Sequence, residues 1–153
     1  RAAAFYVLNR SSYSGTTLSG GMSPGHPRFT ESSIERLRKF RVDNFYVECL
    51  DFRESIPKHD DAFLYLDPPY MNDSNLYGIK GDTHIGFDHQ ALAEILQRRD
   101  RWILSYNDCD EIRELYGDYQ ILSVGWDYGM SKDKRSNEIL ILSRDLKVEP
   151  ITE

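Results

Sequence analysis

The four residues Asp67-Pro68-Pro69-Tyr70, here called the DPPY segment, are the part of the sequence best suited to chemistry. Because a proline has no N–H group, this stretch offers carbonyl oxygens and the Asp67 carboxylate as acceptors with few competing donors. An NH2 group on a planar ring fits such an array: the carboxylate accepts one N–H and a prolyl carbonyl accepts the other. These two bonds draw the nitrogen lone pair out of conjugation, so the nitrogen can attack an electrophile. Tyr70 adds an aromatic face, on which stacking of a nucleobase contributes about 1–3 kcal/mol.

The DPPY segment also has a simpler interpretation, in which it only ends a strand. Proline cannot continue a central strand, and aspartate favours the turn that follows one. However, the preceding residues 62–66 are continuously apolar, which is typical of a strand buried between helices in a parallel sheet. Ligands gather at the carboxyl ends of such strands. The combination therefore favours a functional site.

Strands and helices alternate along the rest of the chain. Besides 62–66, we expect strands at 45–50 and 102–106 and an antiparallel hairpin made of 119–124 and 138–143. A helix should follow its N-cap Asp88, and a shorter one should span 109–116. This order predicts an α/β fold with a mainly parallel sheet and one antiparallel strand at its edge.

The first 41 residues differ in composition from the remainder of the chain. Residues 9–30 are rich in Gly, Pro, Ser and Thr, which predicts a loop, and apolar residues at helical spacing predict a basic helix over 31–41. The segment from Arg28 to Arg41 contains five basic residues and two acidic ones. Both contact with DNA phosphates and an ordinary charged outer face fit this helix.

Composition restricts the protein class. The chain has 153 residues and a formal net charge of −6, which fits one globular domain and argues against a protein that simply coats nucleic acid. It contains no apolar run of about 20 residues and no apolar signal-peptide core. Cys49 and Cys109 stand singly, so neither a zinc site nor a disulfide framework is supported. We expect a soluble, cytoplasmic protein.

Two further segments could contribute to a site. Asp82, His84, Asp88 and His89 could ligate a metal, but capping and solvation explain them better, and no metal site is predicted. Residues 72–84 suit a mobile lid, for which Gly78, Gly81 and Gly86 are the candidate hinges.

A second basic stretch lies near the C-terminus. Lys132, Lys134 and Arg135 surround a single acidic residue, Asp133, which suits contact with phosphate. A solvated turn is an equally simple interpretation.

The DPPY segment is similar to the catalytic signature of amino-group DNA methyltransferases, and further stretches resemble the adenine-specific, Dam-like (D12) class. Leu8-Asn9-Arg10 with Tyr13-Ser14-Gly15 resembles the family's target-recognition hairpin. Residues 47–52 resemble the strand and acidic turn beside the cofactor adenine. Residues 87–92 and 136–141 resemble the helix after the signature and the closing strand.

This resemblance implies a partial Rossmann-like fold, S-adenosylmethionine as cofactor, and methylation of adenine N6 in double-stranded DNA on a flipped base. It implies catalytic roles for Asp67, Pro68, Pro69 and Tyr70, and cofactor contacts for Asp51, Phe52 and Asp67. DNA contacts are expected from Asn9, Arg10, Tyr13 and Ser14, and from the basic side chains Lys132, Lys134 and Arg135. Residues 1–41 would belong to a target-recognition region and 42–153 to the C-terminal part of a catalytic domain.

Some features of the resembled family are not found in this sequence. The N-terminal lysine-containing segment, the Phe-x-Gly-x-Gly cofactor loop and the acidic residue for the cofactor ribose are not present, and no Gly-x-Gly occurs in the chain. We therefore expect weak cofactor binding by this chain alone and a missing N-terminal segment or complementing chain as partner. A non-catalytic DNA- or partner-binding fragment, and a methyltransferase acting on cytosine N4 or on RNA, remain as alternatives.

Overall fold

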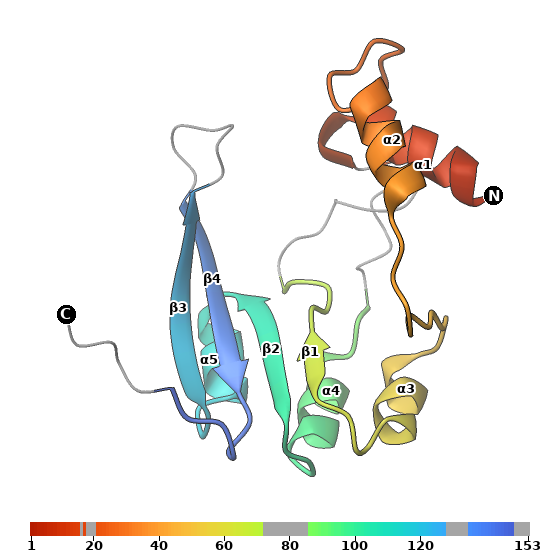
Figure 1. The fold of residues 1–153 in the computed structure, drawn as a ribbon. Coiled ribbons are helices and arrows are strands. Elements are labelled where there is room, and N and C mark those ends of the chain that lie inside the picture. Colours follow the sequence, from red (N-terminus) through yellow and green to blue (C-terminus); the bar gives the residue numbers. More distant parts are fainter. Residues whose placement is uncertain (16, 18–20, 72–85, 128–134, 149–153) are drawn as a thin grey trace. The chain divides into compact units, whose positions relative to one another are not determined.

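The computed structural model describes residues 1–15, 17, 21–71, 86–127 and 135–148 (Figure 1). The chain divides into two compact units, residues 1–48 with 73–86 and residues 49–72 with 87–153. Both units contain helices, and the sheet belongs to the second unit.

The first unit contains helix α1 (Ala2–Ser11), the short 3-10 helix η1 (Tyr13–Gly15) and helix α2 (Glu31–Lys39). The predicted basic helix is thereby confirmed. It starts at Thr30, whose side chain accepts a hydrogen bond from the Ser33 N–H at 3.2 Å, while the Ser33 hydroxyl accepts from the Thr30 N–H at 3.2 Å. This reciprocal capping box satisfies two backbone donors at the start of the helix.

Residues 8–15 do not form the hairpin that the resemblance implied. Leu8 to Ser11 complete α1, and the chain returns through a single antiparallel bridge between Ser12 and Met22. Ala2, Ala3 and Ala4 are strong helix formers, and the helix that they start continues to Ser11, beyond the predicted loop start at residue 9.

The second unit contains a four-stranded sheet in the order β1-β2-β4-β3 (Figure 1). Its strands are β1 (Leu64–Leu66), β2 (Trp102–Asn107), β3 (Gln120–Asp127) and β4 (Arg135–Leu142). Strands β1 and β2 pair in parallel, whereas β4 pairs antiparallel with both β2 and β3. All four predicted strands in this region are present.

The strand pairing differs from the predicted sheet, which was mainly parallel with its antiparallel strand at the edge. Two of the three described pairings are antiparallel, and the strand that runs opposite to the others, β4, lies inside the sheet. The hairpin itself was predicted correctly. Its second strand, however, uses its free edge to bond to β2, which places β3 at the edge.

Two other strand predictions are corrected. Residues 45–50 form no strand within the described chain, and Tyr46 and Val47 are 87% and 79% exposed. A strand requires a hydrogen-bonded neighbouring strand, and no strand of the described chain pairs with this segment. Strand β1 is also not buried on both faces, since Phe63 and Tyr65 are exposed while Leu64 and Leu66 pack against the core.

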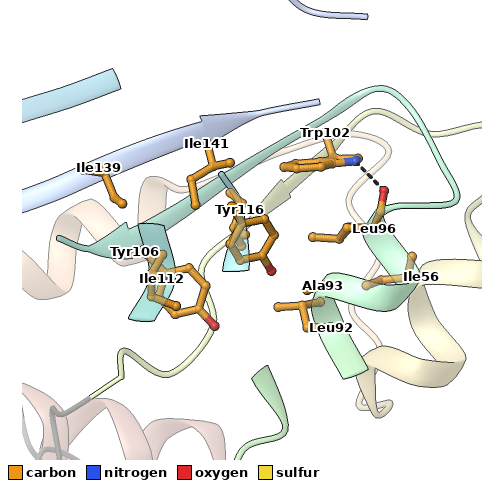
Figure 2. Packing of buried hydrophobic residues seen from close by; sticks show 11 residues of the cluster. Ile56, Leu92, Ala93, Leu96, Trp102, Tyr106, Ile112, Tyr116, Ile139 and Ile141 are labelled. Carbon is orange, nitrogen blue, oxygen red and sulfur yellow. Dashed lines mark hydrogen bonds between the residues drawn. The ribbon is translucent and has the colours of Figure 1, made fainter. Parts of the chain in front are cut away.

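Helices α3 (Phe52–Lys58), α4 (His89–Leu96) and α5 (Asp110–Leu115) complete the second unit. As predicted, Asp88 caps α4, with its carboxylate accepting from the Ala91 N–H at 2.9 Å. A buried hydrophobic cluster joins the helices to β2 and β4 (Figure 2). Its labelled members are Ile56, Leu92, Ala93, Leu96, Trp102, Tyr106, Ile112, Tyr116, Ile139 and Ile141.

Two side chains fix the connections around this core. The Trp102 indole N–H donates to the Leu96 carbonyl at 3.1 Å, which ties β2 to the end of α4 (Figure 2). Arg99 donates to four backbone carbonyls, one in α3 and three between α3 and β1, at distances of 2.8–3.4 Å. The start of β1 is therefore bound to the chain that precedes β2. None of the helices in the described chain is long and apolar enough to cross a membrane.

Candidate functional site

The DPPY segment follows β1 directly, at the carboxyl end of the strand. Because β1 runs parallel to β2, with Leu66 opposite Leu104, the carboxyl ends of both strands lie on the same edge of the sheet. Asp67 is exposed, whereas Pro68, Pro69 and Tyr70 are half-buried. The carboxylate is therefore accessible to a ligand, and the rest of the segment is held against the protein.

Tyr70 is anchored to strand β2. Its hydroxyl lies 3.0 Å from the hydroxyl of Ser105, and its ring centroid lies 6.1 Å from that of Tyr106. Burial raises the pKa of Tyr70 to about 12. The phenol is consequently neutral at physiological pH and offers a fixed aromatic surface beside Asp67.

Tyr106 is held in turn by helix α4. Its hydroxyl is hydrogen-bonded to His89 Nδ1, and the two rings lie 5.6 Å apart. Burial raises the pKa of Tyr106 and lowers the pKa of His89. A neutral imidazole and a neutral phenol therefore meet behind Tyr70.

The candidate cofactor residues Asp51 and Phe52 lie at the start of α3. The Asp51 carboxylate caps this helix by accepting from the Arg53 N–H at 2.9 Å. The Phe52 ring lies 5.1 Å from the Phe87 ring, and the Arg53 guanidinium lies 4.5 Å from the centroid of Phe52. Arg53 is held there by Asp88, at 2.8 Å. A planar ligand that stacks on the face of Phe52 under Arg53 must displace this guanidinium.

An aromatic row links the two parts of the site. Neighbouring centroids from Phe52 to Phe87, His89, Tyr106 and Tyr70 lie 5.0–6.1 Å apart. The structure thus joins the predicted cofactor residue Phe52 to the predicted catalytic residue Tyr70 through Phe87, His89 and Tyr106. Of these three, only His89 was considered for a site from the sequence, as a candidate metal ligand. The sequence did carry one sign that this strand contributes to the site, because Ser105 is the only serine or threonine within residues 102–106.

Asn107 adds an acceptor at the same edge of the sheet. It ends β2, opposite Glu138 of β4. Its Oδ1 atom is buried and receives no hydrogen bond within the described chain. Because a buried acceptor without a donor is costly, a ligand or water that donates to it would be favoured.

In the first unit, the candidate DNA-contacting residues surround η1. Asn9 Nδ2 donates to the Gly15 carbonyl at 2.9 Å, and Arg10 Nε donates to the Arg28 carbonyl at 3.0 Å. Tyr13 is 72% exposed. Gly15 has φ +81°, and a Cβ atom there would lie 3.1 Å from the Arg28 guanidinium and from Asn9. This turn therefore needs a glycine, and Arg28 is a neighbour that the sequence did not reveal.

Several predicted features lie outside the described residues. These are the proposed lid 72–84 with Gly78 and Gly81, Lys132 and Lys134, the candidate ligands Asp82 and His84, and the side chains of Ser14 and Arg135. Gly86 is described and has φ +86°. Within the described chain, no three His, Cys, Asp or Glu side chains are grouped so that they could hold a metal ion.

The sequence was compared with models of known protein families and with curated proteins. A family model described as D12 class N6 adenine-specific DNA methyltransferase matches residues 1–130, which is most of the chain. A search of curated proteins found no match.

Proposed function

Because the chain belongs to the D12 class N6 adenine-specific DNA methyltransferase family, we propose that it transfers a methyl group from S-adenosylmethionine to the N6 amino group of adenine in double-stranded DNA. The observation that carries this proposal is the position of the DPPY segment. An exposed carboxylate follows β1 beside an aromatic ring that is anchored on β2.

The residues of the DPPY segment act on the amino group of the base. The Asp67 carboxylate accepts one N6–H and the Pro68 carbonyl accepts the other, so the lone pair of N6 points away from both. Pro68 and Pro69 keep the segment free of competing donors. Tyr70 stacks on the ring and sets its plane. Because the amino group is otherwise paired inside the duplex, the adenine must leave the base stack first.

Cofactor contacts are proposed for Asp51, Phe52 and Asp67. The fit is supported by the ring of Phe52, on which an adenine can stack, and by the exposed carboxylates of Asp51 and Asp67. S-adenosylmethionine, when bound, supplies an electrophilic methyl group. Arg53 must leave the face of Phe52 that it covers before an adenine can stack on that face.

DNA contacts are proposed for Asn9, Arg10, Tyr13 and Ser14 in the first unit, and for Lys132, Lys134 and Arg135 in the second. The exposed position of Tyr13 beside the Gly15 turn supports the first group. The basic end of α2, with Arg36, Arg38 and Lys39, suits the phosphate backbone.

Product analysis tests the function directly. The protein, supplemented with a polypeptide that carries a Phe-x-Gly-x-Gly loop, is incubated with deuterium-labelled S-adenosylmethionine and duplex DNA, and the digested nucleosides are analysed by mass spectrometry. We expect labelled N6-methyldeoxyadenosine from the wild type and none from Asp67→Ala. Labelled N4-methyldeoxycytidine, or label transferred only to an RNA substrate, would favour the corresponding alternative instead.

Calorimetric titration tests how much of the cofactor site these 153 residues carry. We expect weak or undetectable binding of S-adenosylmethionine, and recovery of binding and activity together when a polypeptide with a Phe-x-Gly-x-Gly loop is added. A dissociation constant of about 1 μM or tighter, or about −8 kcal/mol, would contradict this expectation.

A further inference from the structure

We propose that Ser105 is a positioning residue, which holds the Tyr70 ring in the orientation that a flipped base requires. The inference rests on the proposed function, because it assumes that Tyr70 stacks on the target ring. Its basis is the hydrogen bond between the two hydroxyl groups.

Ser105 is an unusual residue for its place in the fold. It lies in β2, which is bonded to β1 on one side and to β4 on the other, and it is only 4% exposed. Burying a hydroxyl has a free-energy cost unless the group is hydrogen-bonded. The Tyr70 hydroxyl, at 3.0 Å, is the partner that the structure provides. An alanine at this position would avoid the cost of burying a hydroxyl. The hydrogen bond to Tyr70 therefore explains why a serine is found here.

The bond to Ser105 and the contact with Tyr106 restrain different motions of Tyr70. The phenol oxygen lies on the long axis of the ring, so the bond to Ser105 fixes the direction of that axis but not rotation about it. The Tyr106 ring, 6.1 Å away and inclined at 37°, limits this rotation. Two consecutive residues of a central strand therefore set both the axis and the plane of the stacking surface.

The role of Ser105 is one of holding Tyr70 and not of proton transfer. The Tyr70 pKa of about 12 keeps the phenol neutral at assay pH, so Tyr70 retains its proton and can remain hydrogen-bonded to Ser105. A base that stacks on Tyr70 lies parallel to its ring. The orientation of this ring therefore sets where N6 lies relative to the methyl donor. Small misplacements at a reacting centre lower the rate much more than they weaken binding.

The test compares single and double variants by steady-state methylation of a DNA duplex, with each variant complemented by the polypeptide that carries the Phe-x-Gly-x-Gly loop. We expect Ser105→Ala to lower kcat by about tenfold, with KM for DNA changed by less than about threefold. Ser105→Thr retains the hydroxyl and should recover most of kcat. Tyr70→Phe should resemble Ser105→Ala, and the double variant should be no worse than either single one. Ser123→Ala is the matched control, because Ser123 is an exposed serine of β3.

The outcomes separate positioning from a general structural role. Multiplicative loss of kcat in the double variant, or an equal loss in Ser105→Thr and Ser105→Ala at wild-type stability, would overturn the inference. If Ser105→Ala does not fold, Tyr70→Phe and Ser105→Thr still decide, because both leave a hydroxyl at position 105.

A measurement without turnover separates this inference from the proposed function. Selective 13C labelling of tyrosine rings, with Tyr70 assigned from Tyr70→Phe, reports the bond directly. We expect the Tyr70 ring signal to move in Ser105→Ala and to stay in place in Ser123→Ala. An unmoved signal refutes the anchoring by itself. A wild type that shows the anchoring but never methylates DNA, even when it is complemented by the polypeptide with the Phe-x-Gly-x-Gly loop, would instead refute the proposed function, and with it the role in base orientation.

Discussion

The two units hold their candidate site residues in different ways. In the second unit, Tyr70 is anchored to a buried strand and is backed by packed rings from β2 and α4. In the first unit, Asn9 and Arg10 are held by hydrogen bonds to the carbonyls of Gly15 and Arg28, and Tyr13 projects into solvent.

This difference fits the two tasks that we propose for the units. A group that orients a reacting atom needs a support that does not move, and a sheet with a packed core provides one. A surface that reads DNA must adapt to its grooves, and turns and exposed side chains suit that purpose. Variants in the second unit should therefore change rate or stability, whereas variants in the first should change the choice of DNA sequence.

The largest effect is expected from Asp67→Ala. Loss of the carboxylate should lower kcat/KM for methylation by more than about 100-fold, while the thermal unfolding midpoint stays at its wild-type value because the side chain is exposed. Asp67→Asn should be milder but still damaging, because its amide can present a donor where an acceptor is needed. The exposed Asp61 provides the control variant Asp61→Ala. Activity of Asp67→Ala within about tenfold of wild type would contradict the catalytic role of Asp67.

Arg10→Ala tests the first unit. Loss of a base-reading arginine should cost about 1–3 kcal/mol at one position of the recognised sequence and relax the preference there. Loss of a phosphate contact, for which the exposed Arg38→Ala is the comparison, should weaken all sequences alike. The measurement is methylation of a panel of duplexes with single-base substitutions. An unchanged sequence preference would remove Arg10 from recognition.

Arg99→Ala tests how strongly the scaffold of the second unit depends on one side chain. It removes hydrogen bonds to five backbone carbonyls, four of which join it to α3 and to the segment before β1, and we expect the free energy of unfolding to fall by about 2 kcal/mol. The neighbouring Arg98 is exposed, so Arg98→Ala should change stability by less than about 0.5 kcal/mol. Equal effects in urea denaturation would show that the four bonds contribute little.

His89 predicts a pH dependence of stability. Burial lowers its pKa from the ordinary value of 6.5, against the opposing charge of Asp88. The unfolded chain therefore takes up a proton near pH 6.5, whereas the folded chain does so only at lower pH, and stability falls as the pH decreases through this window. The Asp88 carboxyl, whose pKa is lowered by its bond to the Ala91 N–H, titrates below 3.8 and stays charged there.

Denaturation at pH 7.5 and 5.5 measures this dependence. His89→Gln should lose less stability than the wild type between the two values. A His89→Gln variant with the full wild-type dependence would contradict the buried neutral state of His89.

The smallest effect is expected from Tyr116→Phe, which should stabilise the protein by up to about 1 kcal/mol. The Tyr116 hydroxyl is buried and has no hydrogen-bond partner in the described chain, so its removal ends a desolvation cost. Tyr106→Phe is the matched opposite, because it deletes a hydroxyl that is bonded to His89. A loss of stability in both variants would show that the Tyr116 hydroxyl has a partner in solution.

The features that local patterns determine were predictable from the sequence. The spacing of apolar residues predicted α2 and α4, and the capping residue Asp88 predicted where α4 begins. The apolar run before Asp67 predicted β1, and with it the DPPY segment at a carboxyl edge. Each of these predictions depends on neighbours within about one helical turn or one strand.

Only the tertiary structure decided which distant residues meet. It joins Tyr70 to Ser105, 35 residues away, and Arg99 to the carbonyls that precede β1. It also leaves residues 45–50 without a strand partner in the described chain and places β4 inside the sheet. Residue type and spacing determine which groups a side chain can bond to and which segments can form strands. Which partner it meets depends on strand order and register, because these bring together residues that are far apart in the chain, and no local pattern encodes them.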